Sequence, residues 1–137
     1  MIVKKINPLL PKASEISYFL NKIDNNRYYS NYGPLYNQCE KEINKYLKLS
    51  DKISNIMTSS GSSAILACLL YIRKRTKKNY VLVPSFSFYA DVQSIILAGF
   101  KPIFVDVDLK ELSLDENIIS SFFKNSKYRN QIAATII

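Results

Sequence analysis

Histidine is absent from the 137 residues of this chain. Because histidine is the commonest general base and metal ligand, a Ser-His-Asp triad and a histidine-rich zinc site cannot be built from these residues alone. Two acidic residues, Asp106 and Asp108, follow an apolar stretch but have no metal-binding motif around them. We therefore expect no metal site, and we expect these carboxylates to cap the backbone or to form hydrogen bonds within a loop.

Long apolar runs are also missing. The longest, such as residues 64–72 and 95–98, are much shorter than the roughly 20 residues that a bilayer span needs, so no transmembrane helix is expected. The first ten residues hold two lysines and no apolar stretch of signal-peptide length, which predicts a cytoplasmic location. Cys39 and Cys68 should then be reduced. Both fall on apolar helical faces, which predicts buried packing residues.

Acidic residues are few, 11 against 19 basic residues, and the formal net charge of +8 raises the question of nucleic-acid binding. The densest basic run, residues 73–78, falls at the end of an expected helix, where cations complement the helix dipole. The ten tyrosines are scattered and form no aromatic cluster on a strand. We therefore interpret the basic run as a solvated helix end and expect no nucleic-acid partner.

The first 52 residues are predicted to form a helical segment. Ser14 is the expected cap of a first helix, and a turn at Gly33 and Pro34 precedes a second helix that runs to about residue 48. Apolar residues recur at helical spacing in both. These residues are Ile16, Phe19, Leu20 and Ile23 in the first helix, and Leu35, Cys39, Ile43, Tyr46 and Leu47 in the second.

Short apolar stretches alternate with helical patterns in residues 53–137. Strands are expected at residues 53–57, 80–83, 102–105 and 132–137. The helices between them are expected at residues 64–72, at residues 92–96 with Gly99 as the C-cap, and from about Asp115 onward. This order predicts an α/β domain with a parallel sheet, whose ligands lie beyond the carboxyl ends of the strands.

Glycine is scarce, and one of only three glycines, Gly61, lies in a polar turn between an expected strand and an expected helix. There the backbone N–H groups and hydroxyls of Gly61, Ser62 and Ser63 would lie at a helix N-terminus, which attracts an anion such as phosphate. The segment matches neither the Walker A motif nor the dinucleotide motif. The alternative is that Ser60 is an ordinary N-cap.

Aromatic residues gather in a second segment of the same sheet edge. Phe86, Phe88 and Tyr89 follow the expected strand at residues 80–83 and could cover a flat ring, with a stacking contribution of about 1 kcal/mol. The alternative is that Phe86 and Phe88 plug the top of the hydrophobic core. Residues 58–63, residues 84–88 and Asp106 should all lie at this edge.

Four motifs in order resemble those of the DegT/DnrJ/StrS-type pyridoxal-phosphate-dependent aminotransferases, which act on keto sugars attached to nucleotides. Asn-x-Gly-Pro occurs at residues 31–34, and Ser-Gly-Ser-Ser-Ala at residues 60–64 is similar to the family's Ser-Gly-Thr-x-Ala phosphate loop. Residues 87–90 resemble Thr-Phe-x-Ala, and residues 99–108 match Gly-x-x-Pro-x-Phe-x-Asp-x-Asp. Ser62 and Ser87 replace threonines but keep the hydroxyl group.

The resemblance implies that residues 53–137 are an incomplete large domain of a fold-type-I enzyme, mainly a parallel sheet with flanking helices. It implies pyridoxal 5′-phosphate as the cofactor, with Gly61, Ser62 and Ser63 holding the phosphate and Phe88 stacking on the pyridine ring. The Schiff-base lysine and the aspartate that pairs with the pyridinium nitrogen lie downstream in the family. The resemblance therefore implies an N-terminal fragment with no catalytic residue, inactive by itself.

For the complete enzyme, the resemblance implies a nucleotide-linked keto sugar and an amino-acid donor as substrates, in the biosynthesis of polysaccharides or amino sugars, and a homodimer as the assembly. The alternative is a standalone α/β module that holds a phosphorylated ligand at Gly61 to Ser63 and performs no chemistry. The apolar stretch at residues 132–137 would need neighbouring strands, so we expect the chain alone to be marginally folded and prone to associate.

Overall fold

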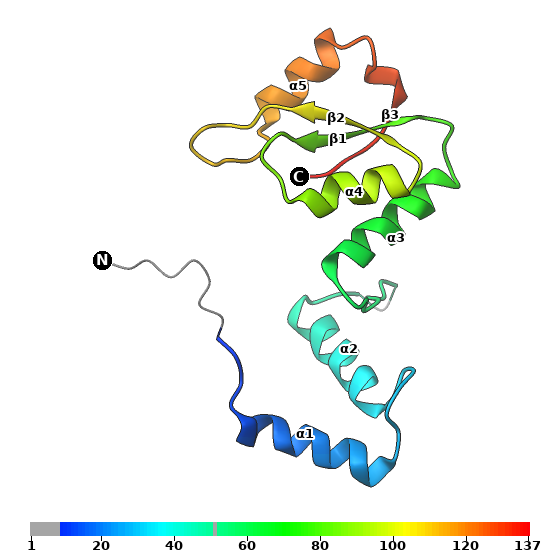
Figure 1. The fold of residues 1–137 in the computed structure, drawn as a ribbon, viewed down its shortest axis with the longest axis vertical. Coiled ribbons are helices and arrows are strands. Elements are labelled where there is room, and N and C mark those ends of the chain that lie inside the picture. Colours follow the sequence, from blue (N-terminus) through cyan, green and yellow to red (C-terminus); the bar gives the residue numbers. More distant parts are fainter. Residues whose placement is uncertain (1–8, 51) are drawn as a thin grey trace. The chain divides into compact units, whose positions relative to one another are not determined.

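The computed structural model describes residues 9–50 and 52–137 (Figure 1). The chain divides into two compact units, a first unit that ends at Met57 and a second unit, Thr58–Ile137. The first unit contains helices α1 (Ala13–Asn26) and α2 (Pro34–Tyr46). The elements of the second unit are α3 (Gly61–Arg73), β1 (Tyr80–Pro84), α4 (Tyr89–Leu97), β2 (Lys101–Val105), α5 (Glu116–Asn125), the 3₁₀ turn η1 (Arg129–Gln131) and β3 (Ile132–Thr135).

The two expected helices of the first unit form, with one correction at the start of α1. Lys12, not Ser14, is the N-cap residue, and its backbone N–H donates to Glu15 Oε2 at 2.7 Å. Glu15, at the third position of the helix, thus forms the half of a capping box in which its side chain accepts from the N-cap backbone N–H. Helix α2 begins with Pro34, whose fixed φ suits the first position of a helix.

The second unit has the expected parallel α/β architecture. Its three strands pair in the order β2-β1-β3, all parallel, and the register places Tyr80 opposite Lys101 on one side and opposite Ile132 on the other. The ladder continues past β3, because the backbone N–H of Ile136 donates to Leu82 O at 2.9 Å. The strands expected at residues 80–83, 102–105 and 132–137 are confirmed.

The strand expected at residues 53–57 is wrong. In the structure this segment is irregular, and Ile53 and Ile56 are 55% and 80% exposed. Its one well-anchored side chain, Asn55, donates from Nδ2 to Glu40 O at 3.1 Å and to Asn44 Oδ1 at 2.6 Å. The segment is therefore tied to α2 instead of to the sheet. A short apolar run becomes a strand only where a neighbouring strand pairs with it.

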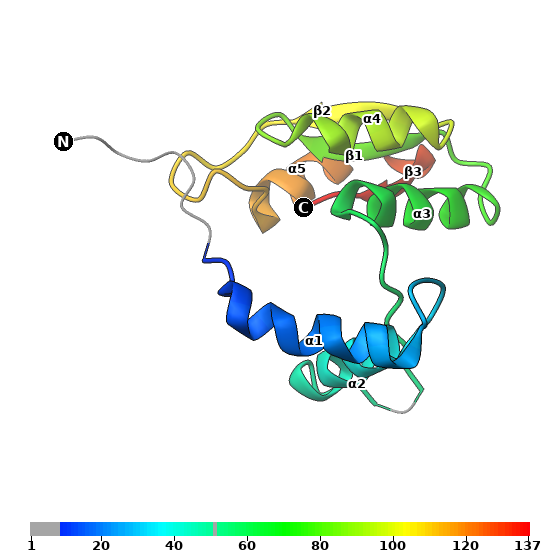
Figure 2. The same ribbon diagram turned by 60° about the horizontal axis from the view of Figure 1, so that its bottom comes forward.

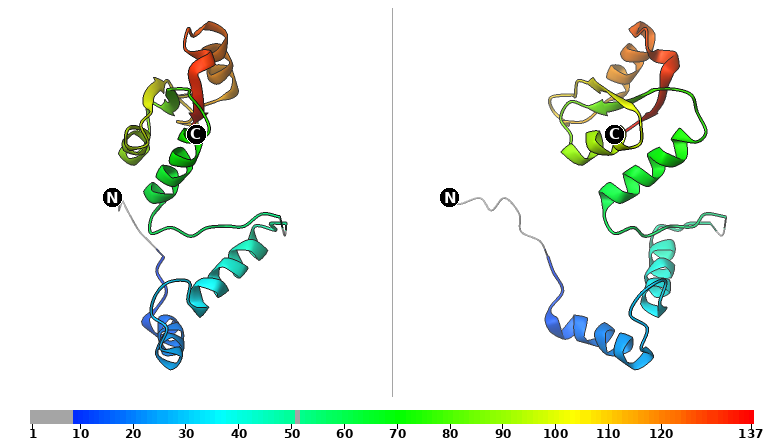
Figure 3. Two further views of the ribbon diagram at one scale, coloured as in Figure 1. Left: turned by 90° about the vertical axis from the view of Figure 1, so that its right-hand side faces the viewer. Right: turned by 45° about the vertical axis from the view of Figure 1, so that its right-hand side comes forward.

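Helices cover both faces of the sheet. Val81 and Val83 of β1 are fully buried on the face covered by α3 and α4, where Ile95 of α4 completes the core. Leu82, between the two valines, is buried on the other face, against Phe122 of α5. Figure 3 shows α4 and α5 on opposite sides of the strands. The alternation along β1 follows the two-residue period of a strand that is buried on both faces.

Small residues allow α3 and α4 to approach each other. Ala90, Ser94 and Ala98 recur every four residues along α4, and each is at most 5% exposed. Residues four apart lie on one face of a helix, so these three form a continuous strip of small side chains. Helix α4 ends at Leu97, and its C-cap residue is Ala98, one position before the expected Gly99. Gly99 follows with φ of +79°, the left-handed conformation that is common just after a helix end.

Both cysteines are exposed, so the expectation of buried packing residues is wrong. Cys39 lies on α2, in which no residue is buried, and Cys68 lies on α3, where the neighbouring Leu69 is the buried residue. Helix α3 is apolar on most of its surface, so its sequence does not indicate which side faces the sheet. None of the helices in residues 9–50 and 52–137 combines the length and the apolar character needed to cross a membrane.

Candidate cofactor site

The N-terminus of α3 is the first part of the candidate site. Ser60 is the N-cap residue, and its Oγ accepts a hydrogen bond from the Ser63 backbone N–H at 3.2 Å. This confirms the N-cap interpretation of Ser60. The backbone N–H groups of Gly61 and Ser62 belong to the unsatisfied first turn, and no acceptor among the described residues binds them. The cap and an anion site can therefore coexist.

The hydroxyl groups of this turn fall into two classes. Ser63 Oγ lies 3.1 Å from Ser59 Oγ and 3.0 Å from Ser60 Oγ, so it belongs to a chain of serine hydroxyls. The Ser62 side chain is exposed and forms no hydrogen bond within residues 9–50 and 52–137. Ser62 is thus the side chain in the turn whose hydroxyl is free to donate to a ligand, whereas a ligand on Ser63 must share its hydroxyl with Ser59 and Ser60.

The loop between β1 and α4 is the second part of the site. Phe86 and Phe88 are 65% and 66% exposed, so the alternative in which they plug the core is wrong. The backbone around Phe88 is nevertheless fixed. Its carbonyl accepts from the Asp91 N–H at 3.0 Å, and the Ser87 hydroxyl donates to the Asp91 carboxylate. The Phe88 ring packs at 51° to the ring of Tyr89, with centroids 4.5 Å apart, and presents its remaining surface to solvent.

Acidic residues after β2 stabilise the adjoining loop. Asp106 Oδ1 accepts from the Ser85 hydroxyl at 3.4 Å, which connects the ends of β1 and β2. Asp108 Oδ1 accepts from the backbone N–H groups of Lys110 and Glu111 at 2.8 and 3.0 Å. The bonds from Glu111 and then Lys110 hold the pKa of Asp108 below its ordinary value. The expected loop hydrogen bonds of both aspartates are confirmed.

A buried serine connects the two helices of the site. Ser94 of α4 is 4% exposed, and its hydroxyl donates to Ser62 O in the first turn of α3 at 3.5 Å. Figure 2 shows α3 and α4 running in the same direction, so that both N-termini lie toward the carboxyl ends of the strands. Ser94 was not among the residues predicted from the sequence. The signal was its position between Ala90 and Ala98 at a spacing of four residues, which indicates a helix face packed closely on its neighbour.

The donor groups at the start of α3 fit a phosphate. The free N–H groups of Gly61 and Ser62 and the Ser62 hydroxyl lie at the positive end of the helix dipole. A Cβ added at Gly61 would meet no atom within 4 Å, so the approach to these donors is open. No group of acidic residues and cysteines within the described part of the chain could hold a metal ion. The arrangement can bind an anion and, at Phe88, offer a flat aromatic surface.

Comparison with known proteins identifies the family. The model of the DegT/DnrJ/EryC1/StrS aminotransferase family matches residues 12–127. The chain belongs to this family. The match includes both helices of the first unit and all of α3, β1, α4, β2 and α5. The family resemblance seen in the four sequence motifs is therefore confirmed.

Named relatives agree with this membership. The dTDP-4-amino-4,6-dideoxy-D-glucose transaminase of Shigella dysenteriae is 30% identical over 101 residues, which are 74% of this chain and 26% of that protein. A protein of Bacillus cereus assigned as a PLP-dependent aminotransferase has a TM-score of 0.75 at 24% identity, covering 91% of this chain and 33% of that chain. A DegT DnrJ EryC1 StrS aminotransferase of Brucella abortus has a TM-score of 0.73 at 23% identity, covering 89% and 32%.

The two structural similarities establish the fold, since both identities are below 25%. The chain is α/β and spans about a quarter of the length of the Shigella transaminase and about a third of the length of each solved chain. Pyridoxal phosphate is the cofactor that the family and these structures imply.

Proposed function

We propose that this chain supplies the phosphate site and the ring platform of a pyridoxal-phosphate-dependent aminotransferase that acts on a nucleotide-linked keto sugar. The proposal depends chiefly on one observation, the free donors of Gly61 and Ser62 at the start of α3. Family membership and the Shigella relative, whose name describes a transaminase for a dTDP-linked amino sugar, support the reaction and the substrate class. An amino-acid donor and a homodimeric assembly belong to the same proposal, and a cytoplasmic location stays a prediction.

In this proposal the residues of the chain bind the cofactor and orient it. The N–H groups of Gly61 and Ser62 and the Ser62 hydroxyl would donate to phosphate oxygens, and the Ser63 hydroxyl would contribute while remaining in its serine chain. Phe88 would stack on the cofactor ring and exclude water from that face. When bound, pyridoxal phosphate supplies an electron sink for reactions at the substrate carbon.

Ser87 and Asp91 position Phe88 in this arrangement. Their hydrogen bond fixes the backbone on one side of Phe88, while the bond from the Asp91 N–H to Phe88 O begins α4 on the other side. A fixed backbone limits the directions that the exposed ring can take, which lowers the entropy lost when the ring stacks on a ligand. Ser87, Phe88 and Asp91 thus form one positioning unit.

The chemistry itself is proposed to require residues beyond this chain. The family resemblance places the catalytic lysine downstream, so the chain is proposed to be an N-terminal fragment that is inactive alone. The alternative, a standalone module that only binds a phosphorylated ligand, shares the α3 site but predicts no completing sequence.

The test is to express the chain alone and the product of the same gene read through the codons that follow Ile137. We expect the chain alone to show no transamination of a dTDP-linked keto sugar, and we expect the lengthened protein to be active. Stoichiometric borohydride trapping of pyridoxal phosphate at one lysine of the short chain would contradict the fragment proposal. An unrelated downstream sequence would favour the binding module. Trapping spread over many lysines is the background expected from a chain with 15 lysines.

A further inference from the structure

Charge is distributed unevenly in the second unit, all of which the structure describes. Its acidic residues follow the strands, since Asp91 lies in the first turn of α4 and the others lie within residues 106–116, between β2 and the start of α5. The basic residues other than Lys110 lie toward the starts of the strands. This group, which we call the basic edge, consists of the basic residues of the run 73–78 together with Lys101, Lys124, Lys127 and Arg129.

Backbone hydrogen bonds bring the parts of the basic edge together. The three strands start level with one another, with Tyr80 opposite both Lys101 and Ile132. Just before β1, the Asn79 N–H donates to Gln131 O at 3.2 Å, and the Lys101 N–H donates to Asn79 O at 2.8 Å. The end of α3, the start of β2 and the turn η1 are far apart in sequence. They therefore meet at one end of the sheet, opposite to the arrowheads of β1 and β2 in Figure 1.

The two arginines near the end of α3 are already engaged within the chain. Arg73 Nη1 donates to Lys78 O at 2.7 Å, and the Arg73 guanidinium carbon lies 4.9 Å from the centre of the Phe100 ring. The Arg75 guanidinium carbon lies 4.4 Å from the centre of the Tyr71 ring. Guanidinium groups are the side chains that bind phosphates and base edges of nucleic acids in a bidentate manner. The freely exposed charge at this end of α3 therefore belongs mainly to lysines, which act as point charges.

The basic edge is far enough from the acidic residues of its unit to act as a positive surface. Strands β1 and β2 have five residues each. At about 3.3 Å per residue, they separate the two ends of the sheet by about 13 Å. The Debye length at physiological ionic strength is about 8 Å, so the acidic groups beyond the strands are largely screened from the basic edge. The basic edge thus keeps a positive potential of its own.

Exposed apolar surface beside these lysines favours a lipid surface over a nucleic acid. Leu70 and Tyr71, in the last turn of α3, are 44% and 58% exposed next to the run at residues 73–78. Leucine and tyrosine beside lysines are typical of segments that lie in the headgroup region of a bilayer. The basic edge is made of a helix end, strand starts and a turn. It therefore presents no helix or two-stranded ribbon that could lie along a major groove.

We propose that the basic edge of the second unit binds a membrane surface rich in anionic phospholipids. The lysines would lie at the level of the charged headgroups, and Tyr71 would enter the headgroup region. This inference goes beyond the proposed function and does not rest on it. The phosphate donors at the start of α3 lie at the other end of the sheet, so membrane binding would leave them open to a ligand.

The test measures co-sedimentation of the 137-residue chain with vesicles at physiological ionic strength. One set of vesicles is phosphatidylcholine with about one third phosphatidylserine, and the other is phosphatidylcholine alone. We expect the wild-type chain to bind the anionic vesicles at least tenfold more tightly than the neutral ones, and added salt should weaken this binding. Millimolar inorganic phosphate should not compete, which distinguishes a lipid surface from a site for free phosphate.

Three variants, each with three positive charges fewer than the wild type, locate the binding. Two change the basic edge, one at the end of α3 and one at the starts of the strands. Each of these should weaken binding to anionic vesicles at least tenfold, because one basic residue near an anionic surface contributes about fivefold. The third variant changes α2 and the residue after it, and as the matched control it should have a much smaller effect. In this order the variants, all at exposed positions, are Lys74→Gln/Lys77→Gln/Lys78→Gln, Lys101→Gln/Lys127→Gln/Arg129→Gln and Lys41→Gln/Lys45→Gln/Lys48→Gln.

Equal binding to both kinds of vesicle would overturn the inference, and so would an equal loss in all three variants, because net charge alone would then explain the binding. A loss confined to one of the two edge variants would overturn the basic edge as a single surface. Binding of a short DNA duplex at these lysines without vesicle binding would assign the surface to nucleic acid and also overturn the inference. Circular dichroism checks that every variant keeps its helices, and titration with pyridoxine 5′-phosphate reports on the α3 site separately.

Discussion

The two units of the chain differ in how many apolar side chains their helices and strands bury. In the second unit, Val81, Leu82, Val83 and Ile95 have no exposed surface, and two clusters of apolar side chains lie on the two faces of the sheet. In the first unit, α1 and α2 contain no buried residue at all. A sheet with helices on both faces makes a core from few residues, whereas two amphipathic helices of 14 and 13 residues do not.

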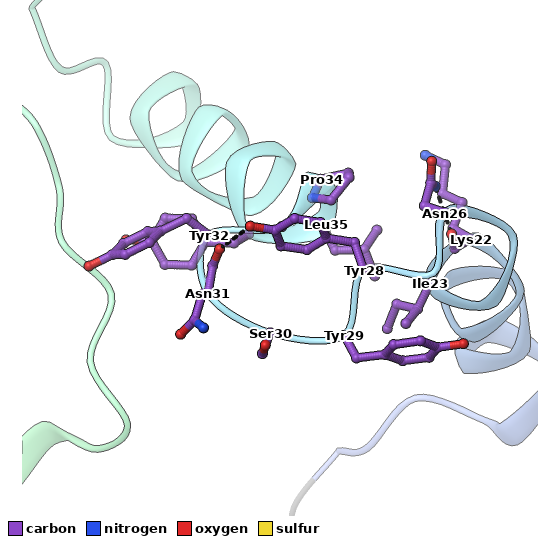
Figure 4. A pocket seen from close by; sticks show the side chains of 12 residues that line it. Lys22, Ile23, Asn26, Tyr28, Tyr29, Ser30, Asn31, Tyr32, Pro34 and Leu35 are labelled. Atoms are coloured by element: carbon purple, nitrogen blue, oxygen red, sulfur yellow. Dashed lines mark hydrogen bonds between the residues drawn. The ribbon is translucent and has the colours of Figure 1, made fainter.

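This difference separates the α3 site from the loop that joins α1 to α2. The α3 site lies on a unit with its own core, so its donors are held by packing that extends through Ser94 to α4. The loop that joins α1 to α2 lies on a unit whose apolar residues, such as Phe19 at 44% exposure, remain accessible to water. We infer that the loop joining α1 to α2 is held by local hydrogen bonds, such as that from the Tyr28 hydroxyl to Asn31 O (Figure 4), while the α3 site depends on the core beneath it.

The largest expected effect comes from deleting core volume in the second unit. Ile95→Ala should destabilise that unit by about 2 to 5 kcal/mol, because it removes fully buried methyl groups and leaves a cavity. Ile16→Ala in α1, where the side chain is 40% exposed, should cost less than about 1 kcal/mol. Urea unfolding followed by circular dichroism, together with hydrogen exchange of each unit, measures both.

The neighbouring Ile96→Ala provides a matched control in the same helix, because Ile96 is 59% exposed. Its cost should resemble that of Ile16→Ala. A loss at Ile16 as large as the loss at Ile95 would break the comparison, since it would show that the first unit buries its helices more fully than the structure indicates.

A smaller effect on stability is expected from replacing two glycines by alanine, one in each unit. Gly99 has φ of +79° and open space around it, the nearest atom to an added Cβ being Arg73 Nε at 3.9 Å. Gly99→Ala should therefore cost roughly 1 to 2 kcal/mol from backbone conformation alone. Gly33→Ala should cost less than about 1 kcal/mol, because the Tyr28 ring is half exposed and can swing aside.

The same urea experiment compares them, and one-dimensional NMR of the tyrosine ring protons detects displacement of the Tyr28 ring in Gly33→Ala. A larger global cost at Gly33 than at Gly99 would show that the loop between α1 and α2 is as strongly packed as the core of the second unit.

The sequence predicted most of the second unit because its strands alternate with helices and pair with one another. It failed at residues 53–57, where an apolar run has no strand beside it, and at Cys68, where an almost uniformly apolar helix does not indicate its buried side. The start of α5 near Asp115 was predicted well, and the structure shows a local reason, since Asp115 Oδ1 accepts from the Ile118 N–H at 2.7 Å. Helix ends that depend on residues close in sequence were therefore predictable, whereas contacts between distant segments were not.

The same distinction applies to the sites. The turn at Gly61 and the exposed ring of Phe88 were found from sequence, although their roles in cofactor binding stay predictions. The contact between Ser94 and Ser62 was missed because it joins residues 32 positions apart. The conformation of the loop that joins α1 to α2 was missed because it includes three residues with positive φ, Arg27, Asn31 and Tyr32, which no simple pattern indicates.

The smallest expected effect is the loss of stability at low pH through Asp108, in an exposed loop of the second unit. The pKa of Asp108 is lowered in the folded chain by the N–H groups of Glu111 and Lys110, so its carboxylate stabilises the fold above the pKa of an unfolded aspartate. This contribution is lost as the pH falls below about 4, through the lowered folded pKa. Asp108→Asn should therefore be slightly less stable than wild type at pH 6 and equal to it near pH 2. A difference in urea midpoint that persists at pH 2 would contradict this assignment.

The central claim is that the first turn of α3 binds the phosphate group of the cofactor, and pyridoxine 5′-phosphate tests it most directly. This compound has no aldehyde, so it does not react with lysines, and its affinity for the chain can be compared with that of pyridoxine. We predict that Ser62→Ala lowers the affinity for pyridoxine 5′-phosphate about tenfold to a hundredfold, since one hydrogen bond to a charged oxygen contributes roughly 1.5 to 3 kcal/mol. The affinity for pyridoxine should not change, and Ser120→Ala, an exposed serine of α5, should affect neither ligand. Equal loss of both ligands in Ser62→Ala, or no loss of either, would contradict the claim and leave the turn as a helix cap.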